Sequence, residues 1–156
     1  HRAWLTAPTY PVTFWTFPHV SLDEPRLPDG SVIRRPVVPL SARTRGATQL
    51  QGVIDSGSPI SAANATLFAD LGIDIDRDEP VHEVSLTVGG QFSRAPVFEV
   101  TLWLHPPTPS EESVAWQLPL VARRGWRLPF AVLLGQRGWF DRFPTRIDST
   151  ASVVEA

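Results

Sequence analysis

The chain has 156 residues, a net charge of −2 and a hydrophobic content of 42%. This length fits one domain that can bury a substantial core without a disulfide or a structural metal. The near-neutral charge gives no electrostatic reason to expect nucleic acid as a partner. Because the chain contains no cysteine, thiol catalysis, disulfide bonds and zinc–thiolate sites are excluded.

Nothing in the sequence indicates a membrane or secretory segment. No stretch approaches the roughly 20 apolar residues that a transmembrane helix needs, and the chain does not open with a signal-peptide pattern. We expect a soluble protein without a membrane segment in this chain, with the cytoplasm slightly favoured as its location. A targeting or anchoring segment outside the chain stays open, because the chain begins at His1 rather than Met.

Prolines are frequent and widely spread, with 16 along the chain. Proline is unfavourable in long helices and central strands, so the sequence predicts a mainly β fold of many short strands. Residues 12–17 have strong strand propensity. Residues 21–36 are polar and rich in turn formers, with a tight turn at Asp29-Gly30, and we expect a linker or a loose hairpin there.

From residue 37 the pattern becomes more regular. Residues 37–44 and 48–55 predict two strands joined by a turn at 45–47. A short helix follows, because three apolar side chains share one helical face and Gly72 is favourable just past a helix end. The three apolar residues on that face are Leu67, Phe68 and Leu71.

Residues 81–104 predict a β-hairpin, because apolar and polar residues alternate on both sides of a Gly-Gly turn. Pro96 is expected to interrupt its ladder. Residues 114–126 predict a further strand, and the apolar run at 128–135 is typical of a strand buried on both faces. We then expect a short helix that Pro144 stops, and a last strand after it. The aromatic residues on one side of that helix are Trp139, Phe140 and Phe143.

Three short motifs carry the functional prediction. In VIDSGS, an apolar pair leads directly to Asp55, and a buried carboxylate is costly unless it is paired or neutralised. By itself this motif also fits a turn that Asp or Ser side chains stabilise. LTVGGQF supplies a glycine-rich turn, and VLLGQRGWF ends an apolar run at a glycine. The motif residues are Asp55, Ser56, Gly57 and Ser58 in the first, Gly89, Gly90 and Gln91 in the second, and Leu133, Leu134 and Gly135 in the third.

In this order and at this spacing, the three motifs resemble those of the retropepsin-like, single-domain branch of the aspartic protease superfamily. The resemblance spans roughly residues 37–148. It implies a small, closed, β-barrel-like half-domain with one or two short helices. Residues 1–36 would then be an N-terminal extension, and residues 149–156 a C-terminal tail.

The resemblance implies that one chain holds half of an active site. Two copies would meet as a homodimer, with two Asp55 carboxylates facing each other across a two-fold axis. Two close carboxylates share one proton. The ionised member would activate a water molecule, and the protonated member would polarise the scissile carbonyl of an extended polypeptide substrate. The resemblance implies no metal and no cofactor.

The resemblance also assigns supporting roles around Asp55. Ser56 would hydrogen-bond across the dimer, Gly57 would let its backbone approach the carboxylates, and Ser58 would bond the outer oxygen of Asp55. The residues that would pack beneath this loop are Leu133, Leu134 and Gly135. Those that would form a flap tip closing over the substrate are Gly89, Gly90 and Gln91.

Some positions depart from the pattern of retroviral members, which often carry an acid and an arginine that help to knit the dimer. Here Pro59 and Gln136 stand at those positions. This difference concerns the contacts of the dimer and not the chemistry. The alternative function is a non-catalytic domain of the same fold, used for dimerisation or binding. The aromatic segment within residues 1–20 adds a strand to the dimer, acts as a self-inhibitor, or covers the core as a surface strand.

Other candidate sites have weaker patterns. Asp148 lies in IDST, which lacks the glycine of the first motif, so we expect the end of a strand there. Three acids have the opening spacing of a calcium loop, but Glu79 replaces the required glycine, and a solvated acidic turn is expected. These acids are Asp74, Asp76 and Asp78. The four histidines show no short metal-binding spacing.

Overall fold

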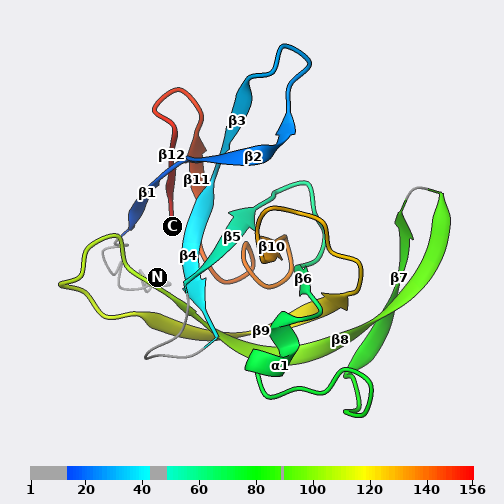
Figure 1. Cartoon of the computed structure of the whole chain (residues 1–156). Helices are drawn as coiled ribbons and strands as arrows, with labels where there is room; N and C mark the ends of the chain where they lie inside the picture. Colours follow the sequence, from blue (N-terminus) through cyan, green and yellow to red (C-terminus); the bar gives the residue numbers. More distant parts are fainter. Residues whose placement is uncertain (1–13, 43–48, 89) are drawn as a thin grey trace, which may run out of the picture.

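The computed structural model describes residues 14–42, 49–88 and 90–156. These residues form twelve strands and one short helix, so the prediction of a mainly β chain is confirmed (Figure 1). The elements are β1 (Thr16–Pro18), β2 (Val20–Arg26), β3 (Val32–Arg35), β4 (Val37–Ser41), β5 (Leu50–Ile54), β6 (Ala62–Asn64), α1 (Leu67–Asp70), β7 (His82–Val88), β8 (Gln91–Leu104), β9 (Val114–Arg123), β10 (Val132–Leu134), β11 (Arg146–Asp148) and β12 (Val153–Glu155).

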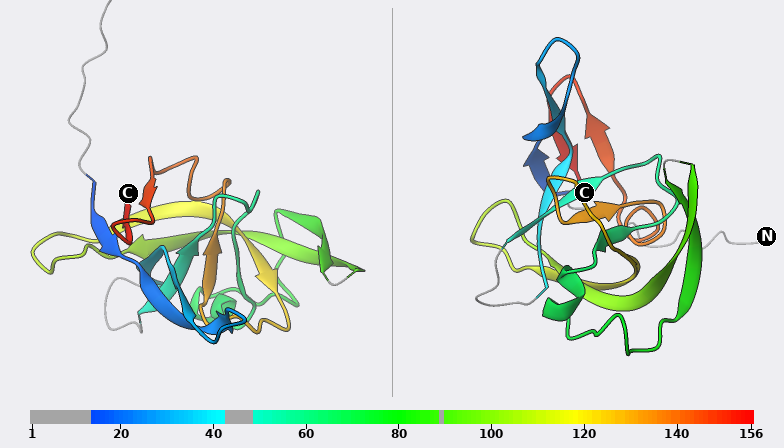
Figure 2. Two further views of the ribbon diagram at one scale, coloured as in Figure 1. Left: turned by 90° about the horizontal axis from the view of Figure 1, so that it is seen from above. Right: turned by 45° about the vertical axis from the view of Figure 1, so that its right-hand side comes forward.

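The main sheet closes on itself. Its strand order is β4-β5-β10-β6-β9-β8-β7, and β4 also pairs with β8. Six strands therefore form a ring, while β7 continues from β8 as the second arm of a hairpin, as Figures 1 and 2 show. The predicted closed, barrel-like half-domain is confirmed.

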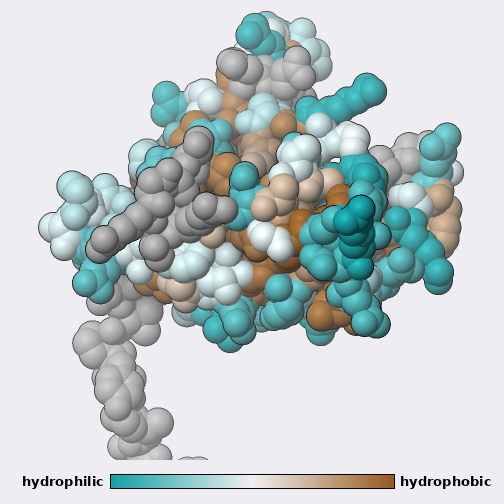
Figure 3. Space-filling view, turned by 60° about the horizontal axis from the view of Figure 1, so that its bottom comes forward, coloured by the Kyte–Doolittle hydropathy of each residue, from teal (hydrophilic) through white to brown (hydrophobic). Residues whose placement is uncertain are grey.

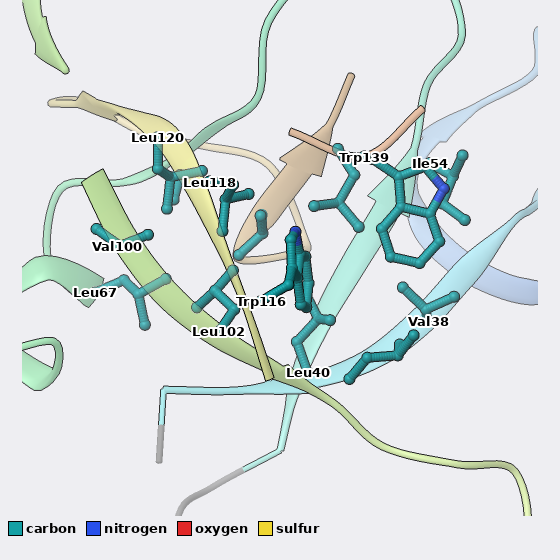
Figure 4. Packing of buried hydrophobic residues seen from close by; sticks show 14 of the residues in the cluster. Val38, Leu40, Ile54, Leu67, Val100, Leu102, Trp116, Leu118, Leu120 and Trp139 are labelled. Carbon is teal, nitrogen blue, oxygen red and sulfur yellow. The ribbon is translucent and has the colours of Figure 1, made fainter. Parts of the chain in front are cut away.

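The ring encloses one large hydrophobic core. On β8, alternate residues face it as the sequence predicts, and each is at most 5% exposed. These residues are Phe98, Val100, Leu102 and Leu104. Trp116 from β9 lies among them and meets Trp139 edge to face, with ring centroids 5.9 Å apart (Figure 4). Large side chains from five or more separate segments thus converge on one centre, which ties the ring together.

The helix predicted after β6 is present but short. Leu67 and Phe68 of α1 are buried in the core, and Leu71 packs against it as the C-cap residue. Gly72 has a φ of +77°, the left-handed conformation that glycine adopts without steric cost. This agrees with the predicted position of the helix end.

The second predicted helix does not form as a regular helix. Residues 136–143 make irregular turns in which Trp139 N and Phe140 N both donate to Gly135 O, each at 3.3 Å. Gly138 has a φ of +108°, which no right-handed helix contains. Its carbonyl oxygen accepts from Trp116 Nε1 instead of from a helical amide. The aromatic side chains still reach the core, because the turns place them there.

The hairpin of β7 and β8 follows the prediction except at Pro96. The pairing continues through Glu83↔Pro96 instead of stopping. The pairing of β8 with β9 begins only at Val97↔Val121, so one side of β8 has no strand partner at the proline. A residue without an N–H is tolerated at such a position.

The chain ends join in a second, three-stranded sheet with the order β1-β12-β11. Phe17 of β1 and Val154 of β12 are buried in the main core. The polar segment after β1 forms the two-stranded hairpin of β2 and β3, which turns at Asp29-Gly30 and projects from the body (Figure 2). The division at residues 36 and 148 stays a prediction, while both flanking segments contribute side chains to the core.

The surface mixes polar and apolar side chains. Figure 3 shows one face, where apolar surface lies between polar groups. Large exposed hydrophobic residues of the described chain are scattered over many elements. They are Phe14, Leu27, Val32, Val81, Phe92, Val114, Leu128 and Ile147. In the part of the chain that the structure describes, no helix has the length and apolarity of a membrane span.

We predict that Trp116→Phe destabilises the protein, because it removes the indole N–H that donates to Gly138 O at 2.9 Å. A buried carbonyl left without a donor costs about 1–3 kcal/mol. Urea unfolding should show a lower midpoint with an unchanged m-value. Trp103→Phe, at a partly buried position of β8, is the matched control. Equal losses in both variants would contradict the role of this hydrogen bond.

Candidate active site

Asp55 lies at the carboxyl end of β5, where two parallel strands end together. β10 pairs in parallel with β5, and Leu134 is opposite Ile54. The amide of Asp55 donates to Leu134 O at 2.8 Å. Val53 and Ile54 are each 3% exposed, so the apolar pair of the motif anchors the strand on both faces. Asp55 therefore lies where the buried strand β5 reaches the edge of the barrel.

β10 lies between β5 and β6, which are consecutive along the chain. The chain leaves β5, makes the turn at residues 55–61 and enters β6, while β10 fills the space between them (Figure 1). Gly52 of β5 leaves room for core side chains: a Cβ there would lie 2.6 Å from Leu40 Cδ1, which would have to shift. The turn after Asp55 is therefore supported from beneath by a buried strand.

The carboxylate of Asp55 is half-buried and has a defined partner. The amide of Gly57 donates to Asp55 Oδ1 at 2.9 Å, and the amide of Ser58 donates to Asp55 O at 3.2 Å. A Cβ at Gly57 would lie 3.3 Å from Oδ1, so glycine leaves the carboxylate room.

The two serines of the motif are not part of the hydrogen bond between the Gly57 amide and the Asp55 carboxylate. Ser56 is exposed at the tip of the turn. Ser58 Oγ donates to Ile60 O at 2.7 Å, whereas the sequence-based expectation was a bond to Asp55. That expectation is corrected for the single chain, because a carbonyl two residues away gives the hydroxyl a local partner.

The third motif packs against this turn. Leu133 pairs with Val53, and Leu134 is fully buried. Gly135 crosses the turn so closely that a Cβ would lie 2.2 Å from Ile60 O and 2.6 Å from Ser58 O. Beyond it, the amide of Gln136 donates to Ser58 O at 2.8 Å. Glycine is required here by contact with backbone and not by its conformation.

Two residues that join these loops were not identified from the sequence. Ser61 is 1% exposed; its Oγ accepts from Gly135 N at 3.0 Å and donates to Arg137 O at 2.8 Å. Gln136 Nε2 donates to Ser56 O at 2.7 Å. A lone hydroxyl beside the buried alanines of β6 was the available signal for Ser61. The position of Gln136 had been considered only as a missing arginine.

The glycine-rich motif forms the tip of the hairpin of β7 and β8. Val88 pairs with Gln91 across the turn, and Gly90 has a φ of +78°. Gly89 lies outside the described residues. Phe92 beside the tip is 72% exposed. Figure 1 shows this hairpin rising at one side of the barrel, with the turn between β5 and β6 nearer the centre of the view.

The root of the hairpin connects to the turn that follows Asp55. Ala95 and Val97 of β8 form a buried cluster with Ala62 and Val121, and Ile60 packs against it. A cavity of about 830 Å³ opens beside β4 and β5, and Asp55 does not line it. The turn after Asp55 therefore contacts the root of the hairpin, and neither Asp55 nor the hairpin lines that cavity.

The weaker candidates have structural roles. The amide of Ala151 donates to Asp148 Oδ1 at 2.9 Å, which lowers the pKa of that carboxyl and stabilises the turn after β11. Asp148 therefore ends a strand, as predicted. Asp76 pairs with Arg124, and Asp74 lies 3.8 Å from Arg77. Among the described residues, no three His, Asp or Glu side chains gather as a metal site would require.

Comparisons with known proteins identify the fold. No protein-family model and no curated protein matches the sequence. A retropepsin-like aspartic protease from Rickettsia conorii matches the structure with a TM-score of 0.54 and 13% identity, covering 96% of this chain and 95% of that one. The protease of Simian Foamy Virus (mac) matches with a TM-score of 0.40 and 16% identity over 69% of this chain and 98% of that one. The barrel with Asp55 at the end of β5, together with the first of these matches, shows that this chain has the retropepsin-like fold.

Proposed function

We propose that this protein is an aspartic endopeptidase that acts as a homodimer. The observation that carries the proposal is the Asp55 carboxylate at the end of β5, held by the Gly57 amide at 2.9 Å within a retropepsin-like fold. Asp55 is the one acid in the turn at residues 55–61. One chain therefore offers half of a two-carboxylate site, and a second copy related by a two-fold axis supplies the other half.

The chemistry follows from the proximity of two Asp55 carboxylates. Because like charges at short range cannot easily both ionise, the pair holds one proton. The ionised carboxylate takes a proton from water as the water oxygen attacks the scissile carbonyl carbon. The protonated carboxyl donates to the carbonyl oxygen and stabilises the tetrahedral intermediate. The C–N bond then breaks as the first carboxyl transfers the proton that it took from water to the leaving nitrogen, and the carbonyl forms again in the product acid.

The hairpin of β7 and β8 supplies the second element of the proposal. Its tip carries Gly90 and Gln91, and the buried cluster at its root contacts Ile60 of the Asp55 turn. An extended polypeptide between this tip and the Asp55 turn would offer backbone groups to both. Closure of the tip would exclude water from the reacting carbonyl. This arrangement supports a polypeptide substrate.

We predict that Asp55→Asn abolishes cleavage of a diverse peptide library at acidic pH. The amide cannot serve as the general base, and loss of general acid–base catalysis costs roughly 10²–10⁴-fold in rate. Asp70→Asn, on the exposed side of α1, is the control and should keep full activity. Cleavage that survives Asp55→Asn would rule out the mechanism. A dimer by sedimentation that cleaves no peptide in the library at any pH would favour the alternative, a non-catalytic binding or dimerisation domain.

We predict different outcomes for two glycine substitutions. Gly135→Ala places a Cβ 2.2 Å from Ile60 O, where only backbone could move, so unfolding should need about 1–3 kcal/mol less free energy. Gly57→Ala places a Cβ 3.3 Å from Asp55 Oδ1 and should keep the thermal midpoint while lowering kcat. Thermal unfolding and peptide assays on both variants measure the difference. A stable Gly135→Ala protein would show that the two loops do not meet as described.

We predict that the two parts of the N-terminal segment differ in their effect on stability. Removing residues 1–20 deletes β1 and buried Phe17, so the thermal midpoint should fall clearly. Removing residues 1–13 leaves both in the chain, so a further fall of the midpoint in the longer deletion measures the contribution of residues 14–20. Activity after the shorter deletion then tests self-inhibition: a rise supports it, and an unchanged rate excludes it. An unchanged midpoint after the longer deletion would contradict the structural role of β1.

A further inference from the structure

The side chain of Gln136 reaches back to the loop that carries Asp55. Its Nε2 donates to Ser56 O at 2.7 Å, although the two residues are 80 positions apart in the chain. A carbonyl oxygen only accepts hydrogen bonds, so the atom facing it is the amide nitrogen, and the orientation of the side-chain amide is fixed by that choice.

The carbonyl that Gln136 holds belongs to a particular peptide group. Ser56 C=O and Gly57 N–H are the two ends of one planar peptide unit. The N–H end donates to Asp55 Oδ1 at 2.9 Å. Gln136 therefore donates to the carbonyl end of the peptide group whose N–H end donates to the carboxylate. Since hydrogen bonds in series polarise one another, the bond from Gln136 also strengthens the donor that Asp55 receives.

The backbone around Gln136 is itself firmly placed. The amide of Gln136 donates to Ser58 O at 2.8 Å, and its carbonyl accepts from the Asp141 amide at 3.1 Å. Gly135, directly before it, is in van der Waals contact with the turn and bonded to buried Ser61. The exposed side chain thus extends from a fixed backbone position, so only its own rotamers have to be ordered for it to reach Ser56.

We propose that Gln136 is a positioning residue that acts through the Ser56–Gly57 peptide group to hold the Gly57 N–H on the Asp55 carboxylate. Its catalytic consequence rests on the proposed protease function. The position differs from the arginine of many retroviral members, and an amide there provides a donor without adding a charge beside the carboxylate. Gln136 touches neither the substrate nor the reacting atoms in this role.

The test uses three substitutions at one position. Gln136→Met keeps the length of the side chain and removes the donor. Gln136→Arg keeps donors that can reach Ser56 O. Gln136→Glu introduces a carboxylate that cannot donate when ionised but can donate its O–H when protonated, near the ordinary glutamic acid pKa of about 4.3. Gln117→Met on the exposed face of β9 is the matched control.

We predict that Gln136→Met lowers kcat about tenfold at every pH while KM stays within about twofold, because the carboxylate loses its fixed orientation and the substrate contacts remain. Gln136→Arg should keep most of the activity. Gln136→Glu should be impaired near neutral pH and should recover relative to wild type as the pH falls through about 4.3. Gln117→Met should match wild type. Unchanged kcat and pH profile in Gln136→Met would overturn the proposal.

A second measurement separates this proposal from the proposed function. In wild type, the Gly57 amide proton resonance should respond to ionisation of the carboxylate that it contacts, and Gln136→Met should reduce that response. This NMR titration needs no substrate. If wild type cleaves nothing, or if Asp55→Asn stays active, the protease function fails and the Gly57 resonance alone decides the role of Gln136. A Gly57 response that is identical in wild type and Gln136→Met overturns the positioning role.

Discussion

The close passage of Gly135 over the turn after Asp55 is the constraint on which the site depends. With no Cβ in the way, the chain after β10 lies directly against Ser58 O and Ile60 O. Backbone amides can then bond to the turn, as Gln136 N does to Ser58 O. The carboxylate accepts from a main-chain amide of that turn, Gly57 N, whose position varies less than that of a side chain. Such preorganisation is what electrostatic catalysis requires of its donors.

The barrel makes that passage possible by inserting β10 between two strands that are neighbours in sequence. β10 has a strand neighbour on each side, with Val132 and Leu134 buried in the main core and Leu133 packed against the smaller cluster that contains Val53, which accounts for its three consecutive apolar residues. Ser61, directly before β6, has a buried hydroxyl. It accepts a hydrogen bond from Gly135 N and donates one to Arg137 O. Because both of its partners lie on the second loop, Ser61 couples β6 to that loop without leaving an unpaired polar group.

The elements set by local pattern could be predicted from the sequence, and those set by distant contacts could not. Alternation along β8 identified its four core residues, and the motif placed Asp55 at the end of a strand. The prediction of a helix after Gly135 was wrong. Gly138 has a φ of +108° and its carbonyl accepts from the Trp116 indole, and helical periodicity reveals neither feature. The pairing of β1 with β12 was likewise beyond a local pattern, since it joins the two ends of the chain.

The sheet formed by the chain ends limits how a second copy can approach. β12 has strand neighbours on both sides within its own chain, so a partner strand that extends this sheet would meet β1 or β11. The absence of the acid–arginine pair at Pro59 and Gln136 then has a consistent explanation. Gln136 donates within its own chain, to the peptide group next to Asp55, so in the proposed dimer each half of the site would be ordered by its own loops. Dimerisation would then have to align two Asp55 turns that are already ordered in each chain, and would not have to order either of them.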